Sequence, residues 1–239
     1  MAGFSQAAIA AAPEAQVPFE VEDAFHAFAR RRRAGEPVAY ILGHREFYSL
    51  QLSVNPAVLI PRPETELLVD LALQRRPASV LDLGTGSGAV ALAIKRHLPG
   101  ATVVAIDSSA TALAVARRNA VKLGLAVDFR HGRWFEPVAG ERFDLVVANP
   151  PYVAEGDPHL PELRHEPVAA LVSGPDGLAA IREIISAAGL FIAPGGCLLL
   201  EHGQGQDAGV RDLLEREGFG SVRTWPDLAG IGRVSGGTR

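Results

Sequence analysis

Short apolar runs alternate with amphipathic segments from residue 79 onward. The apolar runs predict strands at 79–83, 102–106, 126–130, 143–148, 196–201 and 220–225. The amphipathic segments predict helices at 88–98, 109–123, 177–190 and 206–217. Such strict alternation indicates an α/β fold, with right-handed βαβ units building a mostly parallel sheet that carries helices on both faces. A glycine-rich stretch at 231–237 is expected to add a final edge strand.

The N-terminal residues predict one amphipathic helix. Val21, Phe25 and Phe28 are spaced at i, i+4 and i+7, and the helix ends in four arginines at 30–33. An acidic or RNA-bearing partner is one interpretation of that basic run. The favoured interpretation is a solvated helix C-terminus, where cations complement the helix dipole.

Three divisions of the chain follow. Residues 37–60 predict short strands or a hairpin, and Pro63 with Glu64 and Glu66 favours the start of a helix at 65–73. We therefore expect a short helical N-terminal segment at 1–34, a hairpin and linker helix at 35–76, and the main α/β domain at 77–239.

Composition narrows the class of protein. The chain of 239 residues is 48% hydrophobic and 21% charged, which is ordinary for a soluble globular protein. Its net charge of −4 argues against general nucleic-acid binding. No apolar stretch approaches the ~20 residues of a membrane span, and no signal peptide is evident, so a cytoplasmic location is expected. The single cysteine, Cys197, lies in an apolar run, and the scattered histidines predict no metal site.

A glycine-rich loop follows the first predicted strand of the main domain. The loop reads Gly84-Thr85-Gly86-Ser87-Gly88, and Asp107 ends the next strand nineteen residues later. That distance is near the ~20 residues expected of a carboxylate that binds ribose hydroxyls. The spacing differs from the Gly-x-Gly-x-x-Gly of dinucleotide binders, and the chain has no Gly-Lys-Ser/Thr of a P-loop. A turn needed for packing alone is the alternative.

A second motif, Asn149-Pro150-Pro151-Tyr152, follows the predicted strand at 143–148. It places a side-chain amide, rigid carbonyls and an aromatic ring at one strand tip. Such groups suit a planar NH₂ group of an amide or a base amine, although an ordinary strand-to-loop exit has the same residues. Both motifs lie at carboxyl ends of strands, where parallel sheets bind ligands.

These motifs, with others, resemble the release factor glutamine methyltransferase family of class I methyltransferases. The resemblance covers roughly residues 35–235. It also rests on Gly35-Glu36-Pro37, Arg62-Pro63-Glu64-Thr65-Glu66, Asn119, Gly174-Pro175-Asp176-Gly177 and Glu201-His202-Gly203. The Arg-Pro-Glu-Thr-Glu run is specific to the family, whereas Asn-Pro-Pro-Tyr is shared with adenine-N6 DNA methyltransferases. The family usually has a helical domain before Gly35, and only 34 residues precede Gly35 here.

The resemblance implies a Rossmann-like methyltransferase domain at 77–239 that uses S-adenosylmethionine and no metal. Its implied cofactor site comprises Gly84, Thr85, Gly86, Ser87, Gly88, Asp107, Trp134 and Asn149. Trp134 would adjoin the adenine, although a core tryptophan is the alternative. Asn149 and the Pro150 carbonyl would accept the substrate N–H groups, with Pro151 beside them and Tyr152 against the planar amide.

The implied substrate is the glutamine of the Gly-Gly-Gln loop in class 1 peptide chain release factors, methylated at N5 by a monomeric enzyme. No stable nucleic-acid or membrane binding is expected. Three alternatives remain: glutamine methylation of a ribosomal protein, adenine-N6 methylation of nucleic acid, and a nucleotide-binding module without methyl transfer. The net charge and the lack of an evident target-recognition domain disfavour adenine methylation.

Overall fold

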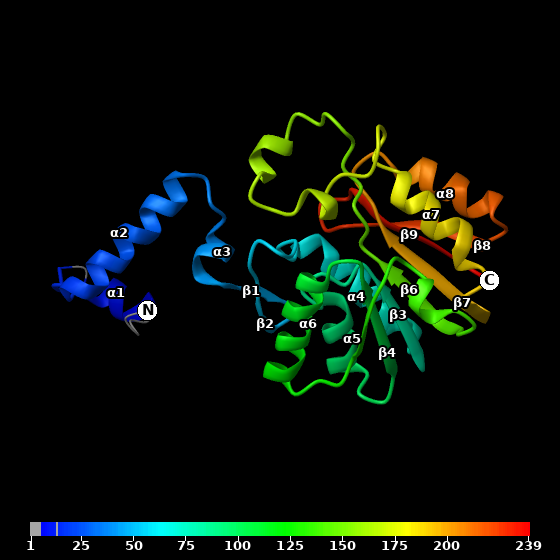
Figure 1. Cartoon of the computed structure of the whole chain (residues 1–239), viewed down its shortest axis with the longest axis horizontal. Coiled ribbons are helices and arrows are strands. Elements are labelled where there is room, and N and C mark those ends of the chain that lie inside the picture. The colour runs from blue at the N-terminus through cyan, green and yellow to red at the C-terminus, as the bar shows by residue number, and fades with distance from the viewer. Residues whose placement is uncertain (1–5, 13) are drawn as a thin grey trace. The chain divides into compact units, whose positions relative to one another are not determined.

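A computed structural model describes residues 6–12 and 14–239 of the chain (Figure 1). Residue contacts divide it into two compact units, Met1–Leu42 and Gly43–Arg239, and each unit is described by itself. Residues 1–5 and 13 of the segment predicted at 1–34 lie outside the described residues. No helix of the described ranges is long and apolar enough to cross a membrane.

The first unit is helical. Its helices are α1 (Gln6–Ala11), α2 (Phe19–Arg33) and α3 (Val38–Leu42). The predicted helix through Val21 and Phe28 is therefore confirmed as α2, whose last turn holds all four arginines. Arg31 in that turn makes two hydrogen bonds to the Glu36 carboxylate, one of them from Nε at 2.7 Å.

The second unit opens with an antiparallel hairpin of β1 (His44–Phe47) and β2 (Leu50–Ser53). The hairpin predicted within residues 37–60 is confirmed by β1 and β2. The strand prediction is wrong for residues 38–42, which form the helix α3. The Pro37 carbonyl accepts the N–H groups of Tyr40 and Ile41 and starts that turn. A short apolar run fits a strand or a helix equally well by periodicity. A 3₁₀ turn, η1 (Pro63–Thr65), then leads into α4 (Glu66–Arg75) as predicted.

A seven-stranded sheet forms the centre of this unit. Its strands are β3 (Ser79–Leu83), β4 (Thr102–Asp107), β5 (Asp128–His131), β6 (Phe143–Ala148), β7 (Ile192–Glu201), β8 (Gly220–Pro226) and β9 (Gly232–Thr238). Their order is β5-β4-β3-β6-β7-β9-β8. The first five in that order pair in parallel, and β9 is antiparallel to both of its neighbours. The predicted α/β class is confirmed.

The last strand corrects one expectation. Residues 231–237 were expected at an edge of the sheet, but β9 lies between β7 and β8. A side chain on Gly236 would place its Cβ 2.3 Å from the Leu198 carbonyl oxygen, so glycine lets the two strands approach closely. If each strand paired only with the strand before it in the sequence, the last strand would lie at an edge of the sheet. The observed position of β9 depends instead on its pairing with the more distant β7.

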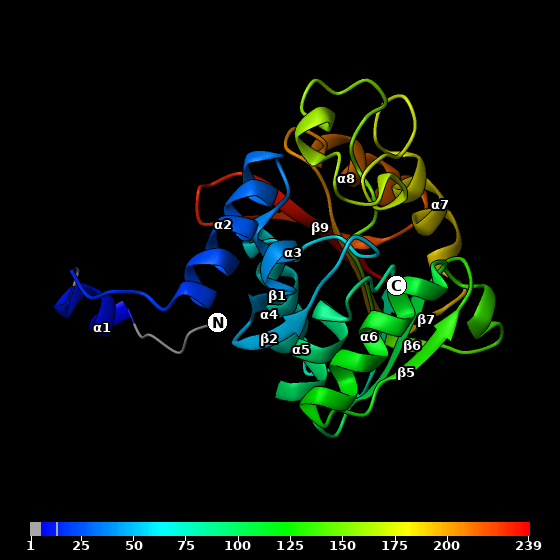
Figure 2. The same cartoon turned by 60° about the vertical axis from the view of Figure 1, so that its left-hand side comes forward.

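Helices cover both faces of the sheet (Figure 2). One face packs against α4, α5 (Ala89–His97) and the end of α6 (Ala110–Leu123), and the other packs against α7 (Ala179–Ala188) and α8 (Asp207–Arg216). Successive strand residues face opposite sides, so Val80 and Leu145 enter the first core while Leu81 and Val146 enter the second. Short 3₁₀ turns η2 (Glu136–Val138), η3 (Leu160–Leu163) and η4 (Val168–Ala170) lie in the connections.

Asn119 of α6 ties the hairpin to the sheet. Its side chain is fully buried; Oδ1 accepts the Ser53 N–H at 2.8 Å, and Nδ2 donates to the carbonyls of Ser53 and Ser87. One amide therefore joins β2, α6 and the glycine loop. A buried polar group with all these partners fixes where the loop stands relative to the hairpin.

Candidate active site

The loop after β3 is held open by its glycines and tied to β4. The N–H groups of Gly84 and Thr85 both donate to the Ile106 carbonyl at 2.9 Å. Gly86 has φ +56°, and a Cβ on it would meet no atom within 4 Å. A ligand can therefore approach the Gly86 backbone, which is the role that the sequence assigned to this glycine.

The two hydroxyl residues of the loop serve the fold. Thr85 and Ser87 are both buried. Thr85 donates its hydroxyl to Asp82 at 2.7 Å, beneath the loop. Burial raises the pKa of Asp82 to about 7, against the opposing effect of the Thr85 hydrogen bond. Thr85, Ser87 and Gly88 do not line the ligand cavity, so their place in the cofactor site stays a prediction.

Asp107 stands at the carboxyl end of β4, directly over the glycine loop. Its Oδ2 accepts the Gly86 N–H and its Oδ1 accepts the Ser109 N–H, both at 2.8 Å. Burial raises the pKa of Asp107, and these two backbone donors oppose the rise. Each carboxylate oxygen keeps a second lone pair, so the group can still accept a pair of hydroxyls.

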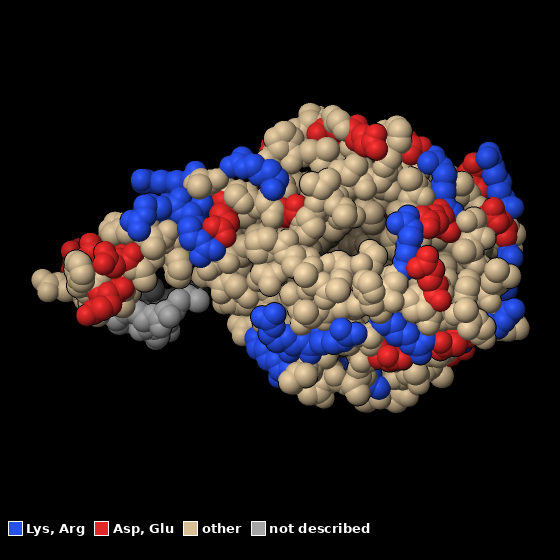
Figure 3. Space-filling view, in the orientation of Figure 1, with Lys and Arg blue, Asp and Glu red and all other residues tan. Residues whose placement is uncertain are grey.

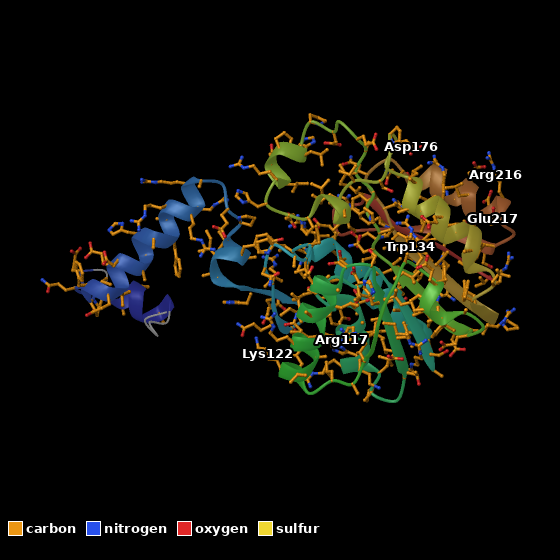
Figure 4. All side chains as sticks on the ribbon, viewed as in Figure 1. Arg117, Lys122, Trp134, Asp176, Arg216 and Glu217 are labelled. Atoms are coloured by element: carbon orange, nitrogen blue, oxygen red, sulfur yellow. The ribbon has the colours of Figure 1, made fainter. Side chains whose placement is uncertain are left out.

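Trp134 forms one wall of the same space. Its ring would lie 3.6 Å from a Cβ on Gly84, and its backbone has φ +46°. The indole Nε1 is buried and makes no hydrogen bond. The pKa of the neighbouring Glu183 carboxyl is lowered mainly by Arg133, which pairs with Glu183, and to a smaller extent by Trp134. Figure 4 labels Trp134 between the sheet and α7.

Asn149 directly follows β6. Its Nδ2 donates to the Thr65 hydroxyl at 3.0 Å, while its Oδ1 is buried and has no hydrogen-bond partner. A buried acceptor without a partner costs roughly 1–3 kcal/mol, so its presence points to a donor that arrives with a ligand. Thr65, which lies 84 residues before Asn149, belongs to the family-specific Arg-Pro-Glu-Thr-Glu run, but its contact with Asn149 was not predicted.

The residues after Asn149 take different places. Pro150 is buried and Pro151 lines the cavity. The Tyr152 hydroxyl donates to Glu201 at 3.4 Å, and its carbonyl accepts from Gln206 at 2.9 Å. Burial raises the pKa of the Tyr152 phenol well above its usual value. Tyr152 does not itself line the cavity, so its contact with a substrate amide stays a prediction.

These groups surround a cavity of about 520 Å³ at the carboxyl end of the sheet. Among its lining residues are Gly84, Gly86, Asp107, Trp134, Asn149 and Pro151. Figure 3 shows this face of the unit hollowed and lined largely by uncharged residues. The volume lies within the range of cavities that bind small molecules and cofactors. The cavity thus joins both motifs predicted from the sequence.

A partly buried ion pair lies close in the chain to the cavity-lining residues Leu59 and Pro167. Glu166 is 5% exposed, and its carboxylate accepts the Ile60 N–H at 3.0 Å and pairs with Arg62 at 2.5 Å. This pair joins the segment before α4 to the long connection between β6 and α7. The sequence reasoning missed Glu166 because nothing in its irregular surroundings marks it as buried. Within the described residues, no group of three or more His, Cys, Asp or Glu side chains could hold a metal ion.

The chain is similar to known protein families. The family model "Methyltransferase small domain" matches residues 63–170, and "PrmC N-terminal domain" matches residues 1–43. The release factor glutamine methyltransferase of Neisseria gonorrhoeae is 50% identical over 226 residues, covering 92% of this chain and 83% of that protein. The protein of the same name from Xylella fastidiosa strain Temecula1 is 51% identical over 222 residues, covering 90% and 81%.

Solved structures share the fold. A methyltransferase from Pyrococcus furiosus has a TM-score of 0.65 at 17% identity, covering 87% of this chain and 98% of that one. A T. thermophilus 16S rRNA N2 G1207 methyltransferase in complex with AdoMet and guanosine has a TM-score of 0.59 at 23% identity, covering 82% and 49%. At these identities the likeness concerns the fold alone.

Proposed function

The chain belongs to the release factor glutamine methyltransferase family, and we propose that it methylates the Gly-Gly-Gln glutamine of class 1 peptide chain release factors. The methyl group would pass from S-adenosylmethionine to the side-chain amide nitrogen, N5. The observation that carries this proposal is the Oδ1 atom of Asn149, a buried acceptor without a partner. A carboxamide NH₂ group is a donor that would satisfy it.

The groups that line the cavity support S-adenosylmethionine as the cofactor. The open space at Gly86 would admit its methionine and ribose portions. The Asp107 carboxylate would accept the ribose hydroxyls, and the Trp134 ring would lie against the adenine with a buried N–H still free. When bound, the cofactor supplies an already activated sulfonium methyl group.

The residues of the protein would contribute by positioning the substrate amide. A carboxamide nitrogen is a poor nucleophile because its lone pair is delocalised into the carbonyl. Asn149 Oδ1 and the Pro150 carbonyl would accept its two N–H groups, aim the nitrogen at the methyl, and stabilise the positive charge that develops on it. One of the two amide protons would leave to water once the nitrogen carries the methyl group. Such preorganised acceptors act without a strong base. Asp107, the acidic residue that lines the cavity beside the glycine loop, is already engaged by Gly86 and Ser109.

Methyl transfer from isotopically labelled cofactor tests this proposal. The chain is incubated with a purified class 1 release factor, and mass spectrometry locates the label. We expect one methyl group on the Gly-Gly-Gln glutamine, and none on a release factor whose glutamine is replaced by alanine. Parallel incubations contain ribosomal proteins and adenine-containing DNA. Label in either of those, with the release factor unlabelled, would contradict the proposed substrate.

A further inference from the structure

We propose that Thr65 and Glu201 are positioning residues that orient the Asn149 amide and strengthen its oxygen as an acceptor. The inference rests on the proposed function, because it concerns the same acceptor amide. It extends the site to two residues that do not line the cavity. Both are buried, Thr65 with 4% of its surface exposed and Glu201 with 1%.

The sheet brings the three residues together. In the parallel pairing of β6 and β7, Ala148 lies opposite Leu200, so Asn149 and Glu201 are the next residues on neighbouring strands. Thr65 ends the 3₁₀ turn before α4 and reaches Asn149 from outside the sheet. Three separate elements therefore meet at one buried polar cluster, where water does not compete for the hydrogen bonds.

The cluster explains which way the Asn149 amide faces. A threonine hydroxyl has one hydrogen to donate and can accept others. Thr65 lies close enough to Glu201 to lower the pKa of that carboxyl, as a hydrogen-bond donor does. A Thr65 hydrogen directed at Glu201 would leave Thr65 as an acceptor for the NH₂ side of Asn149, which is the side that faces it. The oxygen side is then turned away from Thr65 and remains unpartnered.

The Glu201 carboxylate would supply negative charge beside the Thr65 hydroxyl. Its Oε1 accepts the Tyr152 hydroxyl at 3.4 Å, and its buried Oε2 has no partner. Burial raises the pKa of Glu201 to about 7. Thr65 and Tyr152 oppose that rise as donors, Arg233 of β9 opposes it by charge, and Glu64 of the 3₁₀ turn adds to it.

The chemistry follows from cooperativity between hydrogen bonds. An ionised Glu201 polarises the Thr65 hydroxyl, which then accepts more strongly from Asn149 Nδ2. Electron density in the Asn149 amide shifts toward Oδ1. That oxygen faces the substrate nitrogen, where positive charge grows during methyl transfer, so the gain is greater in the transition state than in the ground state. Thr65 and Glu201 should thus affect kcat more than KM.

Threonine variants test the orientation. Thr65→Val keeps the shape and removes the hydroxyl, and we expect kcat to fall by about 10–100-fold, somewhat less than for loss of a direct contact. Thr65→Ser restores a hydroxyl and should recover most of kcat. Thr102→Val is the control, because Thr102 is exposed at the start of β4, the end opposite to Asp107. Cofactor affinity by calorimetry and Tm are measured for each, so a variant that fails to fold is recognised.

The pH profile tests the role of charge. If only ionised Glu201 acts, wild-type kcat should rise as the pH passes about 7. Glu201→Gln should lower kcat about tenfold at pH 8, which is less than direct loss of a preorganised group, and should abolish that rise, while Glu215→Gln on the surface of α8 should keep it.

The outcomes separate the two proposals. An inactive wild type would contradict the proposed function. An active wild type with unchanged kcat in folded Thr65→Val, or with the same pH profile in Glu201→Gln, would overturn the positioning role alone.

Discussion

The carboxylate of Asp107 accepts the backbone N–H of Gly86 at 2.8 Å, which joins the tip of β4 to the glycine loop after β3. The second carboxylate oxygen accepts the Ser109 N–H, at the start of α6. Ser109 also caps that helix, because its hydroxyl accepts the Ala112 N–H. One side chain thus orders the loop, the strand tip and the helix start around the ligand cavity.

Replacing Asp107 should weaken cofactor binding. Asp107→Ala removes the proposed acceptors for two ribose hydroxyls and releases the Gly86 N–H. Hydrogen bonds to charged groups contribute roughly 1.5–3 kcal/mol each, so we expect Kd for S-adenosylmethionine to rise at least tenfold. Isothermal titration calorimetry measures this directly, with Asp212→Ala on the exposed face of α8 as control. Equal affinities in the two folded variants would show that Asp107 does not contact the cofactor.

Gly86→Val should also block the cofactor, and Gly124→Val provides a matched control. Both glycines have positive φ, +56° and +65°, and a Cβ on either would meet no atom within 4 Å. The backbone strain of the two substitutions is therefore similar, about 1–2 kcal/mol. Of these two glycines, Gly86 lines the cavity and Gly124 does not. We expect calorimetric binding to be lost in Gly86→Val and kept in Gly124→Val; similar binding by both would argue against an approach at Gly86.

Asn149→Ala should abolish most turnover while sparing the cofactor. Losing one preorganised contact to developing charge typically lowers kcat by about 10²–10³-fold. Cofactor Kd should stay within a few-fold, because the principal contact proposed for Asn149 is with the acceptor amide. Steady-state methylation of the release factor gives kcat, and Gln51→Ala on the exposed hairpin is the control. Wild-type turnover in Asn149→Ala would refute the mechanism.

Asp82 predicts a pH dependence of stability. Burial raises its pKa from near 4 to about 7, so folding favours the neutral carboxyl. The stabilisation that the neutral Asp82 carboxyl gives the folded state is fully present below about pH 4 and is lost as the pH rises through about 7. Asp82→Asn should therefore reduce the fall in Tm between pH 5 and pH 8 by at least about 2 °C. Thermal unfolding at both pH values tests this, and an unchanged difference would indicate that Asp82 is ionised throughout.

Local patterns predicted the strand tips well. The strands at 79–83 and 143–148 have the predicted bounds, because each is an apolar run that ends at a glycine or at Asn-Pro. These punctuating residues act on their own neighbours, so the chain alone identifies them. Both motifs then meet in one cavity because parallel strands end on the same side of the sheet.

Features that depend on distant segments were not predictable. The bond between Thr65 and Asn149 joins residues 84 positions apart, and the ion pair between Arg62 and Glu166 joins residues 104 apart. No periodicity marks either partner. The place of β9 is of the same kind, since its pairing with β7 and β8 depends on close packing that only the folded sheet reveals.

The insertion of β9 has a practical consequence for expressing and labelling the protein. Because the strand order is β7-β9-β8, loosening β9 uncovers an edge of β7 and an edge of β8 at once. Unpaired edges are templates for aggregation. The backbone of Arg239 is itself hydrogen-bonded to Gly195 and Gly196 at distances of 2.7 and 2.9 Å. A purification tag fused directly after Arg239 could strain β9, which is paired on both sides, so a flexible spacer should precede it.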